Sequence, residues 1–269
     1  TTGGDVTIAA GNSVASSSNG GALSLSAGDG KYSGGDVTVI TGDSDDHITG
    51  AMSLTTAAGG HSSGGITIET GDAATKGVSG ALVFSSGTTK SGNSGAISIG
   101  TGTATNGGSG DISITVGDNN VGAGGRVLVQ AGYSRSTSTS DGGDVEIYAG
   151  KGHAAGGDIS IIAGIGEVNT GGQIMIFSGA GTTESSGELY IQTAATGSGN
   201  TGSMRFSSGI ATDGSSGDLM VGSGHATSGQ SGSISIMVGD TKAVSNDGAE
   251  ITVQAGNSVS GSGAGGYIA

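Results

Sequence analysis

The sequence predicts an all-β fold, a parallel β-solenoid of about 17 coils with about 15 residues in each coil. One observation is a residue pattern that recurs along the whole chain: Gly, variable, apolar, variable, apolar, variable, small, Gly, as in residues 4–11 and 157–164. The other is its period, because the first apolar residues of successive copies are mostly 15 residues apart, with extremes of 14 and 18. Stacked coils that contact only their neighbours are typical of such a short, constant period.

Each copy contains one predicted strand, and we number it from its first apolar residue, position 0. The position 0 residues are Val6, Leu23, Val37, Met52, Ile66, Leu82, Ile97, Ile112, Val127, Val145, Ile159, Ile174, Leu189, Met204, Leu219, Ile234, Ile251 and, in a truncated last copy, Ile268. Position +2 is again apolar, and position +4 is small or Val. This alternation predicts a strand with one buried face.

Glycines bound each predicted strand. Gly stands at position −2 in every copy but one, where Ala249 replaces it, and at position +5 in 15 of 17 complete copies, with Ala57 and Ala194 as the substitutes. We expect the Gly at +5 to turn the chain, since Gly adopts φ > 0 without strain.

The polar segment that follows each strand contains one restricted position. Position +7 is always small, with Asn119 the largest residue there. This restriction suggests a second short strand whose inward residue faces the apolar row, and it favours one coil per copy. A coil of about 30 residues, made of two copies whose apolar rows face each other, also fits the pattern.

A longer period is superimposed on the short one. Residues 82–132 match residues 204–256 at an offset of 122 to 124 residues, which is eight copies. We therefore expect one continuous solenoid over residues 1–269 with an eight-coil super-repeat. Neither end has an atypical polar copy, so we expect a segment of a longer repetitive chain, or ends that meet other subunits.

Composition and charge exclude several classes of function. The chain has 61 Gly, no Cys, and a formal net charge of −14 with only 8 Lys and Arg. Nucleic-acid binding needs a basic face, and no stretch of 18 apolar residues is present to span a bilayer. The four His residues occupy different positions of the repeat, and no Ser, His and carboxylate pattern stands out. We expect no enzyme, no cofactor and no metal, and interpret the Asp residues beside Gly as solvated turn residues.

A lateral contact is predicted on the outward side of the middle copies. There the outward positions +1 and +3 change from Ser, Thr and Ala to large apolar or aromatic residues. These lateral contact residues are Leu128, Tyr148, Ile162, Met175, Phe177 and Tyr190. On successive stacked strands they would form a contiguous apolar strip, which usually marks an interface.

The chain resembles the long Gly/Ser/Thr-rich repeat proteins of diatoms and related algae. The resemblance is carried by the sequence of residues 84–99, followed by Gly102-Thr103-Ala104-Thr105-Asn106-Gly107-Gly108. The resemblance covers essentially the whole chain. It implies a large, secreted, repetitive protein, and it carries over no catalytic residue.

The predicted function is that of a structural extracellular or cell-surface rod or fibre, which self-associates end to end and laterally. The alternatives are a surface adhesin or an ice-binding β-solenoid, although the outward Thr row is broken by residues such as Ile40, Glu69 and Val83. Outward Ser and Thr are chemically able to carry O-glycans, whereas no Asn-x-Ser/Thr acceptor for N-glycans occurs.

Overall fold

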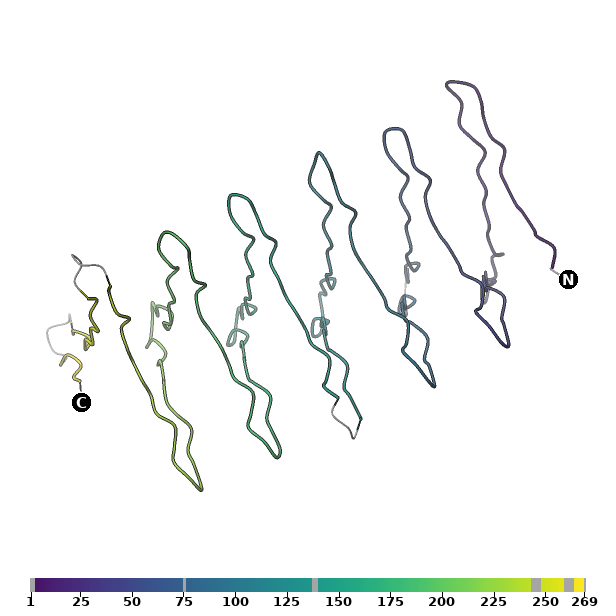
Figure 1. The fold of residues 1–269 in the computed structure, drawn as a ribbon. Coiled ribbons are helices and arrows are strands. Elements are labelled where there is room, and N and C mark those ends of the chain that lie inside the picture. Colours follow the sequence, from purple (N-terminus) through teal and green to yellow (C-terminus); the bar gives the residue numbers. More distant parts are fainter. Residues whose placement is uncertain (1–2, 75, 137–139, 243–247, 259–263, 269) are drawn as a thin grey trace. The chain divides into compact units, whose positions relative to one another are not determined.

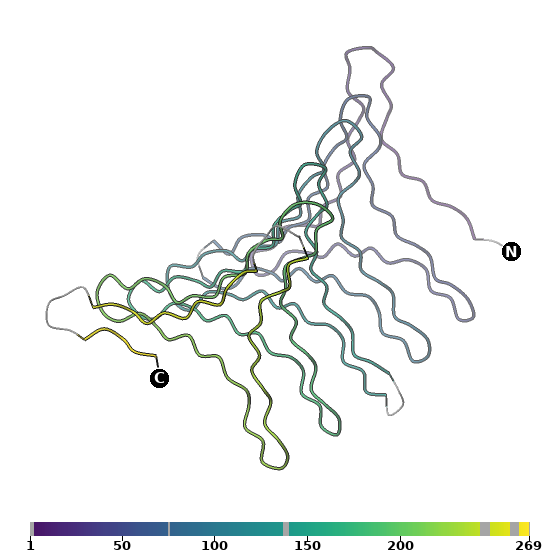
Figure 2. The ribbon, with the colours of Figure 1, turned by 60° about the vertical axis from the view of Figure 1, so that its left-hand side comes forward.

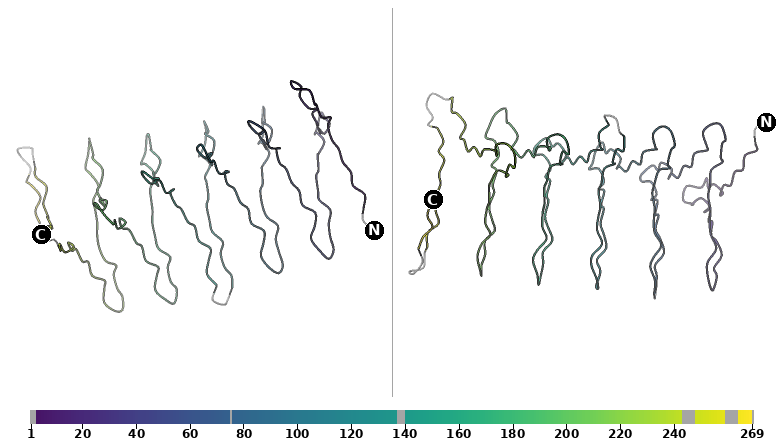
Figure 3. Two further views of the ribbon diagram at one scale, coloured as in Figure 1. Left: turned by 45° about the horizontal axis from the view of Figure 1, so that its top comes forward. Right: turned by 90° about the horizontal axis from the view of Figure 1, so that it is seen from below.

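The computed structural model describes residues 3–74, 76–136, 140–242, 248–258 and 264–268. The chain divides into two units, Thr1–Val129 and Gln130–Ala269. Within each unit, extended segments alternate with narrow reversals of the chain (Figure 1). We call positions −1 to +4 of each copy a leg, and the segment from position +5 to position −2 of the next copy a turn. Figures 2 and 3 show the same alternation from other directions.

The described residues form no helix and no strand, so the prediction of a parallel β-solenoid, or β-helix, is wrong. A strand requires backbone pairing with a neighbour, and the backbone hydrogen bonds of these residues lie within turns. No described leg is hydrogen-bonded to the next leg, as a 15-residue coil requires. None is bonded to the leg after that, as a 30-residue coil requires.

The apolar rows of the legs are exposed to solvent. No hydrophobic side chain of the described residues is buried, and typical position 0 residues such as Ile97 and Ile159 are 56% and 54% exposed. The chain has 27005 Å² of accessible surface, whereas a folded monomer of its mass has about 10,000 Å² and its unfolded chain about 36,000 Å². The predicted buried face is therefore present as a pattern but covers no core in the single chain.

Among the described residues, one backbone hydrogen bond closes the mouth of each of eight turns. In every case the N–H of the Gly at −2 donates to the C=O of the Gly at +5, with N to O distances of 2.8 to 3.2 Å. These closed turns are 11–21, 28–35, 42–50, 132–143, 150–157, 164–172, 179–187 and 256–266.

Close approach at the turn mouth explains the small residues that flank it. A Cβ added to Gly21 would lie 3.2 Å from the Gly11 nitrogen and 3.5 Å from the Ala10 Cβ. A Cβ on Gly172 would lie 3.3 Å from the Ala163 Cβ. Ala10 and Ala163, both at position +4, belong to the few described residues that are partly buried. In these closed turns position −2 is Gly, and +4 is small, because two segments of backbone meet there; at Gly110, whose turn is not closed, an added Cβ would come no nearer than 3.8 Å to another residue.

Position +7 lies inside the turn, which corrects the prediction that it faces the apolar row. A Cβ added to Gly30, Gly59 or Gly152 would overlap the backbone carbonyl oxygen three residues further on. Three non-glycine residues at this position, Ser44, Ser134 and Ala226, are partly buried. The turn backbone, and not a Val/Ile row, therefore restricts position +7.

Polar side chains at position +7 hydrogen-bond to the backbone of their own turn. The Ser44 Oγ accepts from the His47 N–H at 3.0 Å, and the Thr89 Oγ1 donates to the Ser91 carbonyl at 2.8 Å. The Asn119 Nδ2 donates to the Ala123 carbonyl at 2.7 Å. Such local bonds are the usual reason for Ser, Thr and Asn in turns. The small size of the residues at position +7 does not by itself predict these hydrogen bonds to the turn backbone.

Positive φ occurs at a different glycine from the one predicted. Among the described residues, φ lies between 96° and 121° at six glycines inside turns, and at no glycine of position +5. These glycines are Gly77, Gly92, Gly122, Gly199, Gly214 and Gly229. A Cβ on the +5 glycines Gly87 and Gly117 would meet nothing within 4 Å, which agrees with the presence of Ala57 and Ala194 at that position in other copies.

Closed turns and turns with a positive-φ glycine occur in separate blocks along the chain. The first three turns are closed, positive-φ glycines follow between Gly77 and Gly122, and four closed turns begin at Gly132. Positive-φ glycines return from Gly199 to Gly229, and the turn from Gly256 is closed again. In the closed turns position +7 is Gly or Ser, whereas it is Ala, Thr or Asn in the turns with positive φ. The turns 57–64 and 102–110, with Gly59 and Ala104 at position +7, have neither feature, so position +7 distinguishes the two kinds of turn but does not by itself produce either geometry.

We expect Gly30→Ala to open the turn 28–35, because its Cβ would overlap the Ser33 carbonyl oxygen. Overpacking of this kind costs about 1 to 3 kcal/mol. Hydrogen exchange of the Gly35 N–H, which donates to the Gly28 C=O at 2.9 Å, measures the effect. Gly34→Ala is the matched control, since its Cβ comes no nearer than 3.8 Å to the Gly28 oxygen. Equal exchange in the two variants would contradict this assignment of position +7.

Candidate interaction surface

Each leg has one side that carries only uncharged residues. Positions 0, +2 and +4 hold Val, Leu, Ile, Met, Phe, Ala, Ser or Thr in every copy, and never a charged residue. We call this side the apolar face. Because successive residues of an extended segment point to opposite sides, all three positions share that side. The apolar face is uncharged in every leg, and its position 0 and +2 side chains are exposed in each described leg.

The opposite side of the leg, positions −1, +1 and +3, carries the leg's charges, and we call it the outer row. Two hydrogen bonds show that these positions share a side. The Tyr148 hydroxyl at +3 donates to the Glu146 Oε1 at +1, at 3.1 Å, and the Thr252 hydroxyl at +1 donates to the Glu250 Oε1 at −1, at 3.1 Å. The acidic residues at −1 are Asp5, Asp36, Asp111, Asp144, Asp158, Glu188, Asp218 and Glu250.

The six predicted lateral contact residues all lie in the outer row and are all exposed. Their exposed fractions range from 61% at Leu128 to 86% at Ile162, with Phe177 at 82%. Met175 and Phe177 belong to one leg, at positions +1 and +3. The other four, Leu128, Tyr148, Ile162 and Tyr190, come from four separate legs. The structure brings Met175 and Phe177 onto the same side of one leg, and the contiguous strip stays a prediction.

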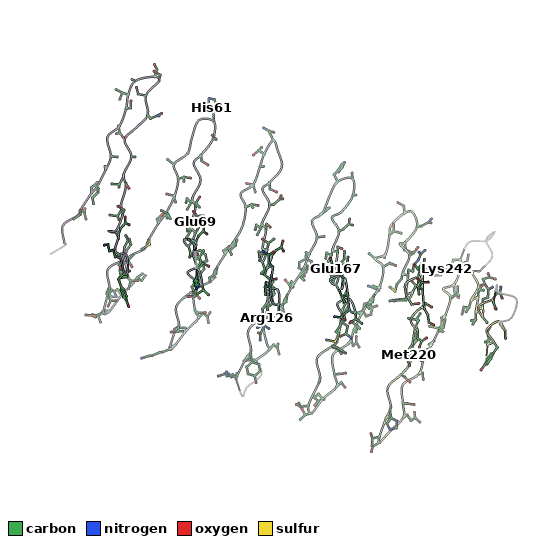
Figure 4. The ribbon with its side chains drawn as sticks, turned by 180° about the vertical axis from the view of Figure 1, so that it is seen from behind. His61, Glu69, Arg126, Glu167, Met220 and Lys242 are labelled. Atoms are coloured by element: carbon green, nitrogen blue, oxygen red, sulfur yellow. The ribbon has the colours of Figure 1, made fainter. Side chains whose placement is uncertain are left out.

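The ionisable side chains offer no candidate metal site in the part of the chain that the structure describes. Figure 4 shows His61 at the outer end of its turn and Glu69 on the leg that follows. All four His residues are exposed. Among the described residues, no three His, Asp or Glu side chains are placed to hold a metal ion together. In the same ranges, no helix has the length and hydropathy needed to cross a membrane. The apolar face and the outer row are therefore the candidate interaction surfaces of the described residues.

Comparisons with known protein families, curated proteins and solved structures found no match. The interpretation of this chain therefore depends on its own repeat pattern and geometry.

Proposed function

We propose that this chain is a non-catalytic structural protein of the extracellular space or cell surface, which self-associates end to end and laterally into filaments. The observation that carries the proposal is the exposure of an apolar face on every described leg. A contiguous apolar surface on a protein usually marks an interaction site. Here the same surface recurs in each copy of the repeat, which suits an assembly of many equivalent contacts.

Thermodynamics also favours association. Ordering the backbone costs about 1 to 2 kcal/mol per residue. Gly, of which the chain has 61, loses more conformational freedom on ordering than any other residue. Full burial of a Val, Leu or Ile side chain returns about 1.5 to 3 kcal/mol. A single chain with half-exposed apolar faces gains only part of this free energy of burial. Contact between copies would bury the remaining apolar surface.

The extracellular location rests on the resemblance to secreted repeat proteins of diatoms and related algae. The non-catalytic role rests on the sequence, in which the four His residues take different positions of the repeat and no catalytic motif recurs. Exposed Ser and Thr in the outer row would remain available to O-linked glycans in such an assembly.

Sedimentation velocity over a wide range of protein concentration, combined with electron microscopy, tests the proposal. We expect the mass to rise with concentration and filaments to appear. A mass of one chain at every concentration would contradict self-association. A thermal-hysteresis assay on the same samples separates the ice-binding alternative, which requires a regular Thr array that residues such as Ile40 and Arg205 interrupt.

A further inference from the structure

We propose that the apolar face of each leg is covered by the apolar face of a second copy of this chain, leg against leg. The proposal rests on the proposed function as a self-associating protein, and it specifies which surface makes the contact. The turns would then remain at the margins of the contact, and the charged residues of the outer rows would remain in water.

Charge matching favours a leg of this protein over a charged partner, and because the described legs of the single chain leave their apolar faces exposed, the occupant is a leg of a second copy. No charged residue stands at position 0, +2 or +4 in any copy, although the chain has 22 Asp and Glu and 8 Lys and Arg. A nucleic acid or another charged polymer would find no partner charge on this side, and burying an unpaired charge is costly. The apolar face of another copy is free of charge at every equivalent position, so the contact leaves none buried.

Size and shape point in the same direction. The accessible surface of the chain is 27005 Å², which is about 17,000 Å² more than a folded monomer of this mass exposes. A standard protein interface buries about 1,600 Å² in total, or about one tenth of that excess. One standard partner would leave most apolar faces exposed, whereas equivalent legs of further copies can cover them one by one. The extended legs also have backbone groups that no other described leg pairs, and an added extended chain pairs such groups.

The turn mouths limit where a partner leg fits. At the mouth, the Gly at −2 already approaches position +4 closely, as between Gly125 and Val116, where an added Cβ would lie 2.7 Å from the Val116 Cγ1. Val116 is accordingly among the less exposed large apolar residues, at 46%. The neighbouring Ile114 at position +2 is 75% exposed. Position +2 is therefore the most accessible part of the apolar face and the best place for a contact probe.

The absence of Cys from the sequence allows a direct test. Ile99→Cys places one thiol on the apolar face, and Ser98→Cys places one on the outer row of the same leg. Ile236→Cys and Ser235→Cys form the equivalent pair in the second unit, on a leg without a lateral contact residue. Each full-length variant is labelled with benzophenone maleimide, assembled with unlabelled chain and illuminated. Denaturing electrophoresis then measures the yield of covalent dimers.

We expect the probe on Ile99→Cys and Ile236→Cys to give about fivefold more dimer than the probe on Ser98→Cys and Ser235→Cys, because the photoreaction needs contact with the neighbouring chain. Equal yields, or a higher yield from the outer row, in chains that do assemble would overturn the proposal while leaving self-association intact. Assembled chains in which the face is shielded from thiol reagents but yields no dimer would show cover by the same chain, which also overturns it. Failure of unlabelled chains to assemble at all would instead contradict the proposed function.

Discussion

Raising the NaCl concentration from about 10 mM to about 500 mM is expected to lower the protein concentration needed for assembly by at least about tenfold. The chain carries a formal net charge of −14, so copies repel one another as they approach. The screening length falls from about 30 Å at 0.01 M to a few ångströms near 1 M salt. A tenfold change in the assembly constant corresponds to about 1.4 kcal/mol, which is a modest change for repulsion between many like charges. Light scattering against protein concentration at each salt level measures the threshold.

A charge variant separates screening from the general effect of salt on apolar contacts. The triple variant Asp111→Asn, Asp144→Asn and Asp158→Asn removes three charges at position −1, in the outer row. We expect it to assemble at lower concentration in low salt and to depend less on salt than the unmodified chain. If assembly instead weakened as salt increased, attractive ion pairs would have to dominate the contact, and the repulsion argument would be wrong.

Phe177→Ser is expected to weaken lateral association about 10- to 100-fold without preventing assembly through the apolar faces. Phe177 is 82% exposed in the single chain and shares the outer row of its leg with Met175. Burial of a side chain of this size contributes about 1.5 to 3 kcal/mol, which is the source of the expected factor. Electron microscopy of filament width, together with sedimentation, distinguishes loss of bundling from loss of assembly.

Ile40→Ser is the matched control for Phe177→Ser. Ile40 also occupies position +3 and is 82% exposed, but it lies outside the six lateral contact residues. We expect filament width to be unchanged by Ile40→Ser. Equal narrowing by both substitutions would show that outer-row apolar residues act generally, and the lateral contact would then not be specific to Leu128, Tyr148, Ile162, Met175, Phe177 and Tyr190.

Local features of the chain could be predicted from the repeat pattern. The alternation at positions 0 and +2 corresponds to extended legs such as those that contain Ile97 and Ile159, because an extended backbone places alternate residues on one side. The pattern also predicts restricted residues at positions −2, +4 and +7, but at +7 it points to the apolar row as the cause, which is wrong. Gly30 and Ser44 are restricted by the backbone of their own turns, and small side chains in a repeat look the same whether a turn or a core confines them.

The position of the positive-φ glycines could not be predicted in the same way. Gly87 and Gly92 are both turn glycines in sequence, yet only Gly92 has φ in the left-handed region, at 96°. The difference depends on where the backbone reverses between two legs, which is a property of the whole turn. Hydrogen bonds such as that from Thr89 to the Ser91 carbonyl take part in that geometry.

The sequence by itself determined the period, the extended legs and the uncharged apolar face, because each follows from residue spacing and side-chain chemistry along a short stretch. Only the tertiary structure decided whether the legs pair with one another, and in the described residues they do not. The physical reason is that a leg with an apolar face gains stability from any equivalent face that covers it. Residues such as Ile99 and Ile161 need a surface that covers them. Their spacing is the same whether that surface is a leg of the same chain or a leg of another copy.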